Sequence, residues 1–183
     1  MSIASSGLAL FVSKVNAERL GAYGVHLLIG DDVAQHRWRS DDRENIYSAS
    51  KGVCALAIGM AVDEGIMSLD SSVQEMLPAM ALGAGVDKVT VRHLLTMCSG
   101  IDFKWFGDQP VSWPDLAQEM LRRPTSGPGA VFQYTDASTY VAMRIAWREG
   151  RRCARLVDAA LVRPARNSQS AMAPVPARLG RRW

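Results

Sequence analysis

The segment over residues 50–65 constrains the fold of this chain more than any other part of the sequence. Its side chains are apolar almost all the way round a helical turn from Val53 to Val62, and the first charge after them is Asp63. A helix without a polar face is normally buried. Gly65 suits the position just beyond a helix end, where φ is positive. The sequence therefore predicts a buried helix over residues 50–65.

Other patterns place elements on both sides of this helix. Two short apolar runs, residues 25–29 and 33–38, flank a Gly-Asp-Asp turn at residues 30–32, which predicts a β-hairpin. Thr90 is a predicted helix cap, and the Pro- and Gly-rich residues 124–129 predict a sharp turn. A short helix that stops or bends near Pro78 is expected over residues 73–80. Further helices are expected over residues 91–97, 115–123 and 137–147, and an extended segment over residues 131–134.

Length and composition fit a globular domain or part of a larger one, since 48% of the 183 residues are hydrophobic. No apolar run approaches the roughly 20 residues that cross a bilayer, so no membrane partner is expected. The apolar run at residues 8–12 is shorter than the roughly 7–15 residues of an export signal, which favours a cytoplasmic location. The three cysteines and three histidines show no ligand spacing, so neither a metal nor another cofactor is expected.

Charge divides the sequence into two unequal parts. Residues 1–147 carry 12 Lys or Arg and 16 Asp or Glu, whereas residues 148–183 carry nine Arg and two acids. We interpret residues 1–24 as an N-terminal lead-in, residues 25–147 as the folded domain, and the remainder as an irregular basic tail. The tail has three interpretations: a flexible native tail, a nucleic-acid arm, or loss of the reading frame near residue 150, which we favour. The tail has no Lys and one aromatic residue, which disfavours nucleic acid as a partner.

Ser48 and Lys51 are the first candidates for chemistry. Residues three apart lie on the same face of a helix, so the hydroxyl and the amine can touch. A serine nucleophile needs an adjacent base. Burial and the positive end of the helix dipole are expected to lower the pKa of Lys51 towards that role. Ser50 adjoins Lys51 and points elsewhere, which makes it the weaker nucleophile. The alternative is that Ser48 only caps the helix.

Tyr134 and Asp136 form the second candidate group. They follow the sharp turn at residues 124–129 and precede the helix expected from Ala137. A tyrosine in such a place can transfer protons if a nearby ammonium lowers its pKa. The alternative is a core tyrosine followed by an aspartate that caps the helix.

Four motifs occur in a defined order along the chain. Residues 47–52 read YSASKG, residues 65–73 GIMSLDSSV, residues 89–101 VTVRHLLTMCSGI and residues 128–140 PGAVFQYTDASTY. Together they resemble the S-x-x-K, G-x-L-x-L-D-x-x-V, T-V-R-H-L-L-T-H-T-S-G-L and P-G-x-x-F-x-Y-S-N-x-x-Y motifs of the serine β-lactamase and penicillin-binding superfamily. The similarity is to its class C-like branch of esterases, β-lactamase-related hydrolases and D-amino-peptidases, and it covers about residues 25–147.

The resemblance implies an activity and a role for each candidate. The activity is hydrolysis of an ester, a small amide or a β-lactam through an acyl-enzyme. Ser48 would be the acylated nucleophile, and its backbone amide would supply half of the oxyanion hole. Lys51 would take the serine proton, and Tyr134 would relay protons to the leaving group and activate the deacylating water. Asp136 would occupy the substrate-binding position of the family's asparagine.

Two departures from the family pattern open alternatives. An ionised Asp136 accepts hydrogen bonds but cannot donate them as an asparagine does. If it paired with Lys51 instead, it would keep that lysine charged and a poor base. In addition, no K-T-G or H-x-G motif follows Tyr134.

We therefore expect an α+β fold that holds only the N-terminal portion of a β-lactamase/transpeptidase-like domain. This portion comprises the hairpin and the helical region and lacks the later sheet strands. The alternative function is a catalytically inactive fragment of such an enzyme. An unpaired sheet edge also predicts self-association, beside a small-molecule substrate as the main partner.

Overall fold

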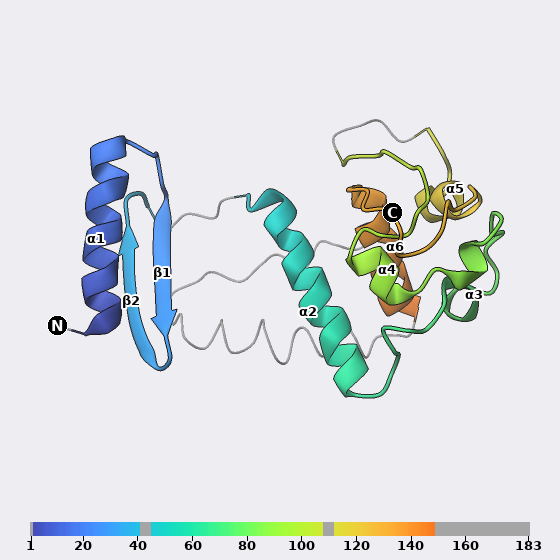
Figure 1. Ribbon diagram of the computed structural model, residues 1–183, viewed down its shortest axis with the longest axis horizontal. Coiled ribbons are helices and arrows are strands. Elements are labelled where there is room, and N and C mark those ends of the chain that lie inside the picture. Colours follow the sequence, from blue (N-terminus) through green and yellow to red (C-terminus); the bar gives the residue numbers. More distant parts are fainter. Residues whose placement is uncertain (1, 41–44, 108–111, 149–183) are drawn as a thin grey trace. The chain divides into compact units, whose positions relative to one another are not determined.

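The computed structural model describes residues 2–40, 45–107 and 112–148 of the chain (Figure 1). The chain divides into two compact units, Met1–Ile46 and Tyr47–Trp183. The first unit contains the predicted hairpin, and the second contains all four candidate site residues. The basic tail predicted over residues 148–183 lies, beyond its first residue, outside the described part of the chain.

A hairpin is the central feature of the first unit. Strands β1 (Gly24–Ile29) and β2 (Asp32–Arg37) pair antiparallel with Ile29 opposite Asp32, so two residues form the turn. Gly30 in this turn has a φ of 59°, in the left-handed region that glycine adopts without a steric penalty. The hairpin predicted from the sequence is confirmed.

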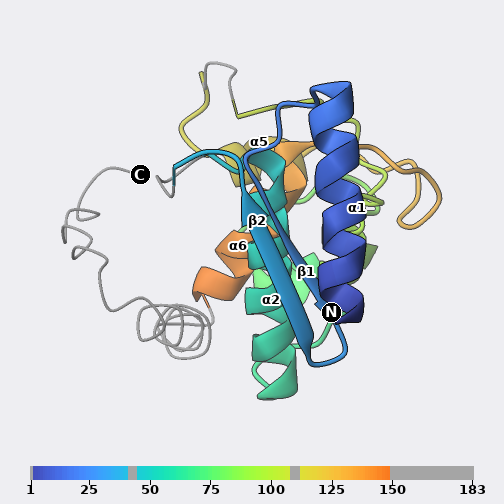
Figure 2. The ribbon, with the colours of Figure 1, turned by 90° about the vertical axis from the view of Figure 1, so that its left-hand side faces the viewer.

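Helix α1 (Ile3–Glu18) runs alongside the hairpin (Figure 2). Ser2 caps its first turn, and the amide of Ala4 donates to the carboxylate of Asp32 at 2.7 Å. Residues 1–24, expected as a lead-in, thus contain a 16-residue helix. The sequence pattern gives little sign of it, because its apolar residues are spread around the helix rather than gathered in one stripe.

The second unit is built from helices packed on a common core. Ile58, Leu94, Met120 and Ile145 come from four different helices and are fully buried together. Burial of each such side chain contributes about 1.5–3 kcal/mol. The elements of the unit are η1 (Tyr47–Ala49), α2 (Ser50–Asp63), α3 (Val73–Met76), η2 (Val86–Lys88), α4 (Val91–Leu95), α5 (Leu116–Leu121) and α6 (Asp136–Arg148). Helix α6, which begins at Asp136, contacts α4, α5 and also α2, the helix that carries Lys51.

Helix ends in this unit follow the local sequence. The Thr90 hydroxyl accepts from the His93 amide, and His93 Nδ1 accepts from the Thr90 amide, which makes a reciprocal cap at the start of α4. The predicted cap is confirmed. Helix α3 ends at Met76, in agreement with the expected stop near Pro78, because a proline disfavours helical geometry at the residue before it.

Helix α2 is covered unevenly within the second unit. Ala57, Ile58 and Ala61 are buried, but Val53 and Leu56 are 45% and 57% exposed in the described structure. The second unit by itself therefore buries one side of the predicted helix and leaves the side with Val53 and Leu56 uncovered. Within the second unit α2 packs mainly on α6, which covers one side of the helix only.

Gly83 lies where a side chain would strike the backbone at the end of α5. A Cβ built there would stand 2.3 Å from the carbonyl oxygen of Arg123, and the Gly83 amide donates to Leu121 at 2.9 Å. We expect Gly83→Ala to lower the free energy of unfolding by about 1–3 kcal/mol, since the backbone must shift. Urea denaturation measures this. Gly59→Ala is the matched control, because a Cβ there meets nothing within 4 Å and alanine favours the helix. Equal stability of the two variants would contradict the close packing at Gly83.

Candidate active site

The turn before α2 presents Ser48 at the surface. Tyr47 has a φ of 46°, a left-handed conformation that costs a non-glycine residue about 1–2 kcal/mol. The 3-10 turn Tyr47–Ala49 then leads directly into the helix. Ser50 Oγ donates to the Tyr47 carbonyl at 2.7 Å, so its hydroxyl is used within this turn. Ser48 is exposed, and its hydroxyl is the one that faces the other candidate residues.

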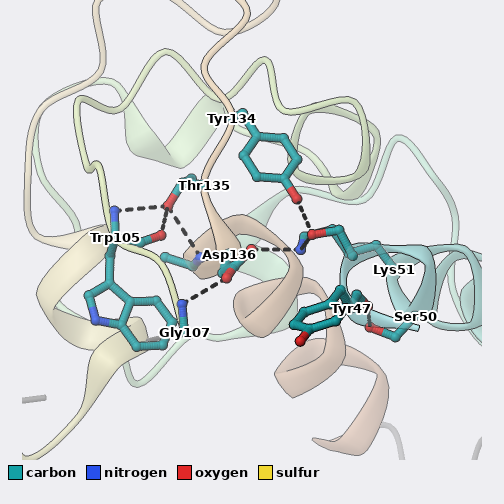
Figure 3. Close-up of polar contacts among 10 residues, drawn as sticks. Tyr47, Ser50, Lys51, Trp105, Gly107, Tyr134, Thr135 and Asp136 are labelled. Carbon is teal, nitrogen blue, oxygen red and sulfur yellow. Dashed lines mark hydrogen bonds and ion pairs between the residues drawn. The ribbon is translucent and has the colours of Figure 1, made fainter. Parts of the chain in front are cut away.

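Ser48 Oγ lies within hydrogen-bond distance of two side chains. Lys51 Nζ donates to it at 3.1 Å, and Tyr134 Oη donates to it at 2.6 Å. Lys51 Nζ also stands 5.1 Å from the centre of the Tyr134 ring. Figure 3 shows the lysine amine and the tyrosine hydroxyl directed to the same point. The contact predicted from the i, i+3 spacing is present, and a residue 86 positions away in the sequence joins it.

Backbone hydrogen bonds fix the segment that carries Tyr134. Before it, the amide of Gly129 donates to Cys98 at 2.7 Å and the amide of Gln133 donates to Met97 at 2.8 Å. After it, the Asp136 amide donates to the Trp105 carbonyl at 3.0 Å. Tyr134 is thus held on both sides without belonging to a helix or strand, and this fixes its hydroxyl over Ser48.

Asp136 is the first residue of α6, and its carboxylate has two partners. Oδ1 forms an ion pair with Lys51 Nζ at 2.6 Å, and Oδ2 accepts from the Gly107 amide at 2.8 Å. The carboxylate lies between the lysine and the segment at Trp105 in Figure 3. The alternative in which Asp136 pairs with Lys51 is therefore present in the structure. A direct contact of Asp136 with substrate stays a prediction.

These contacts shift the pKa of each group in a definite direction. Burial lowers the pKa of Lys51, but hydrogen bonds and charge from Asp136 and Tyr134 outweigh it, so that the net pKa is raised. This corrects the expectation that the pKa of Lys51 is lowered. Interaction with Lys51, followed by the hydrogen bond with Ser48, lowers the pKa of Tyr134. Burial would raise the pKa of Asp136, but Lys51 and the Gly107 amide lower it overall.

Phe106 and Gly107 belong to this site although the sequence patterns do not indicate them. The Phe106 ring stacks on Tyr134 with centroids 6.2 Å apart and an interplanar angle of 20°. The Gly107 amide reaches Asp136 only through tertiary contact across 29 residues. Neither position has a spacing or motif that reveals it. The arrangement as a whole is the exposed hydroxyl of Ser48, flanked by the charged amine of Lys51 and by the phenol of Tyr134, whose pKa is lowered.

Two further features concern what the described residues lack. Across residues 2–40, 45–107 and 112–148, no cluster of His, Cys, Asp and Glu is arranged to hold a metal ion. In the same part of the chain, no helix combines the length and apolar character that crossing a membrane requires.

Solved structures share this architecture. A D-stereospecific amidohydrolase from Streptomyces sp. is 25% identical, with a TM-score of 0.56 over 72% of this chain and 45% of its own. A family VIII carboxylesterase is 29% identical, with a TM-score of 0.51 over 61% of this chain and 31% of its own. A class C β-lactamase, at 21% identity, shares the fold with a TM-score of 0.69 over 96% of this chain and 54% of its own. The chain thus spans between about a third and a half of the length of these structures.

The fold and the family comparison agree with the expectation from the four motifs. The described part of the chain has the hairpin and helical region of an α+β fold, which matches the expected N-terminal portion of a β-lactamase-like domain. The family model described as Beta-lactamase matches residues 3–183. This match includes α1 and extends through the basic segment. The chain belongs to the β-lactamase family.

Proposed function

We propose that this chain is a serine hydrolase that forms an acyl-enzyme on Ser48, with Lys51 and Tyr134 as its catalytic partners. The observation that carries the proposal is the position of Ser48 Oγ, 3.1 Å from Lys51 Nζ and 2.6 Å from Tyr134 Oη. A serine hydroxyl reacts only when a neighbouring group takes its proton. Among the described residues, Lys51 and Tyr134 both lie within hydrogen-bond distance of this hydroxyl and together provide a route for its proton.

The reaction is a two-step acyl transfer. The Ser48 proton passes to the Lys51–Tyr134 pair as Oγ bonds to the carbonyl carbon, whose oxygen becomes an oxyanion. The oxyanion collapses, the bond to the leaving oxygen or nitrogen breaks, and that atom takes the proton. A water molecule then loses a proton to the same pair and attacks the acyl carbon. The acid product leaves and Ser48 regains its proton.

Esters, small amides and β-lactams are the proposed substrate classes. All three have a carbonyl carbon that an activated serine attacks. Among the similar structures, one is named a carboxylesterase and another an amidohydrolase, which supports esters and amides as classes to test. A cytoplasmic location and self-association through an unpaired hairpin edge stay predictions.

A panel of chromogenic substrates tests this proposal on the full chain. We expect a p-nitrophenyl ester to be hydrolysed faster than a D-amino acid p-nitroanilide or a chromogenic cephalosporin, because an aryl ester has the best leaving group. Turnover must rise linearly with protein concentration and exceed that of buffer. If a folded, monodisperse sample hydrolyses none of the three, the result rejects the proposed activity on these substrates and favours the catalytically inactive alternative.

A further inference from the structure

A charged amine and a backbone amide converge on the carboxylate of Asp136 from different segments. Lys51 Nζ approaches Oδ1 at 2.6 Å, and the backbone amide of Gly107 approaches Oδ2 at 2.8 Å. An ionised carboxylate accepts at both oxygens, whereas an asparagine would offer one acceptor and turn its own NH₂ group towards the other donor. The acid therefore matches this environment, and the family's asparagine would not.

The ion pair is partly shielded from water. The side chains of Lys51 and Asp136 are 20% and 28% exposed, in contrast to the pair between Arg92 and Asp70, whose side chains are 51% and 73% exposed. Shielding strengthens the attraction between opposite charges, because less water screens it. Lys51 is accordingly held in the charged form next to Ser48.

The same carboxylate also holds the segment that covers Tyr134. Gly107 directly follows Phe106, whose ring stacks on the Tyr134 ring. Trp105, one residue earlier, accepts at its carbonyl from the Asp136 amide at 3.0 Å and from Thr135 Oγ1 at 2.9 Å. One residue thus ties α2, α6 and residues 105–107 together around the candidate nucleophile.

We propose that Asp136 is a positioning residue that keeps Lys51 as an ammonium and thereby makes Tyr134 the group that receives the Ser48 proton. The inference rests on the proposed function. It also replaces the predicted contact with substrate, since both carboxylate oxygens are directed to partners within the chain.

The proton balance follows from these charges. A Lys51 ammonium has no lone pair and cannot accept a proton. The Tyr134 phenolate accepts the Ser48 proton as Oγ bonds to the carbonyl carbon, and the neutral phenol then returns it to the leaving atom. Lys51 stays charged throughout and stabilises the phenolate, in keeping with the lowered pKa of Tyr134.

The pH dependence of acylation has a sign that can be worked out. Acylation requires Tyr134 ionised, so its rate rises with pH through a pKa that lies below the ordinary tyrosine value of about 10. It also requires Lys51 charged, so the rate falls again at a pH above the ordinary lysine value of about 10.4. Without the Asp136 carboxylate, the high-pH fall moves to lower pH.

NMR titration of ¹³C-labelled lysine, combined with acylation rates, tests the inference on the full chain. The sequence has only four lysines, so Lys51 is assignable with a Lys51→Arg variant. We expect Asp136→Asn to lower the pKa of Lys51 by about one unit or more. The pH at which the acylation rate falls should be lower by the same amount as the Lys51 pKa. In addition, kcat should fall and KM should change little.

Matched variants make the result decisive. Asp70→Asn removes the exposed ion pair with Arg92 and should leave Lys51 unchanged. Asp136→Glu keeps the negative charge, so its Lys51 pKa should stay close to that of the wild type. A shift in Asp136→Asn that is absent from Asp136→Glu is then due to the lost charge and not to damaged folding. An unchanged Lys51 pKa in Asp136→Asn overturns the inference, as does a KM effect without a pH shift. Faster acylation at pH 7 would also overturn it, because a neutral Lys51 would then be the base.

The two proposals fail in different ways. If the wild-type chain is not acylated while Lys51 titrates as expected, the proposed function and the role of Tyr134 as base are both rejected, and only the ion pair remains. If the wild-type chain is acylated but Lys51 does not respond to Asp136→Asn, the proposed function stands and the role of Asp136 is rejected.

Discussion

Ser48→Ala will reduce ester hydrolysis to the buffer background, a loss of about 10⁴- to 10⁶-fold in kcat. The reason is that Ser48 Oγ is the atom on which Lys51 and Tyr134 converge, at 3.1 Å and 2.6 Å. Removal of the hydroxyl leaves the two flanking groups without a nucleophile. Steady-state hydrolysis of a p-nitrophenyl ester measures the effect, with far-UV circular dichroism to confirm the fold.

Ser50→Ala is the control for this substitution. Ser50 is two residues away, but its hydroxyl is directed to the Tyr47 carbonyl at 2.7 Å. Its loss should reduce stability slightly and leave acylation in place. If Ser48→Ala retained activity while Ser50→Ala lost it, the assignment of the nucleophile would be wrong.

Tyr134→Phe should lower kcat by about 10²- to 10⁴-fold, the range typical for loss of a group that transfers protons. Phenylalanine keeps the ring that stacks on Phe106, so the melting temperature should change little. What it removes is the hydroxyl 2.6 Å from Ser48 Oγ, together with the site whose pKa is lowered beside Lys51. Measurement of kcat, KM and melting temperature on one preparation separates these effects.

Tyr140→Phe provides the matched comparison for Tyr134→Phe. Tyr140 lies on α6, is 42% exposed, and is not part of the proposed machinery. Its substitution should leave kcat within about two-fold of the wild type. Equal losses in the two variants would point to general damage, and full activity of Tyr134→Phe would show that Lys51 alone handles the proton.

Local features of this structure could be predicted from the sequence because short-range chemistry decides them. The contact between Ser48 and Lys51 follows from their spacing of three residues at a helix start. The Thr90 cap and the hairpin turn at Gly30 have equally local causes. The turn before Tyr134 marked this residue as a candidate, but its role beside Ser48 came only from the motif resemblance, since no local rule brings together residues 86 positions apart.

Features that depend on tertiary contact could not be decided from the sequence, which offered the pairing of Asp136 with Lys51 only as an alternative. The pKa of Lys51 is raised rather than lowered because Asp136, on another helix, outweighs the effect of burial. The second unit covers α2 on one side only and leaves Leu56 on its outer face, a division that the uniformly apolar sequence of this helix does not reveal. The Gly107 amide contributes through its backbone, which carries no residue signature, so its contact with Asp136 is invisible in the sequence.

Intact mass after incubation with a fluorophosphonate probe tests the central claim most directly, because the probe phosphonylates an activated serine hydroxyl and leaves ordinary serines unmodified. The measurement needs the full chain, wild type and Ser48→Ala, each shown to be folded and monodisperse. A single adduct on the wild type, mapped to Ser48 and absent from the variant, is the result predicted by the contacts of Ser48 with Lys51 and Tyr134. An unmodified wild-type chain, or an adduct that persists in Ser48→Ala, would contradict it.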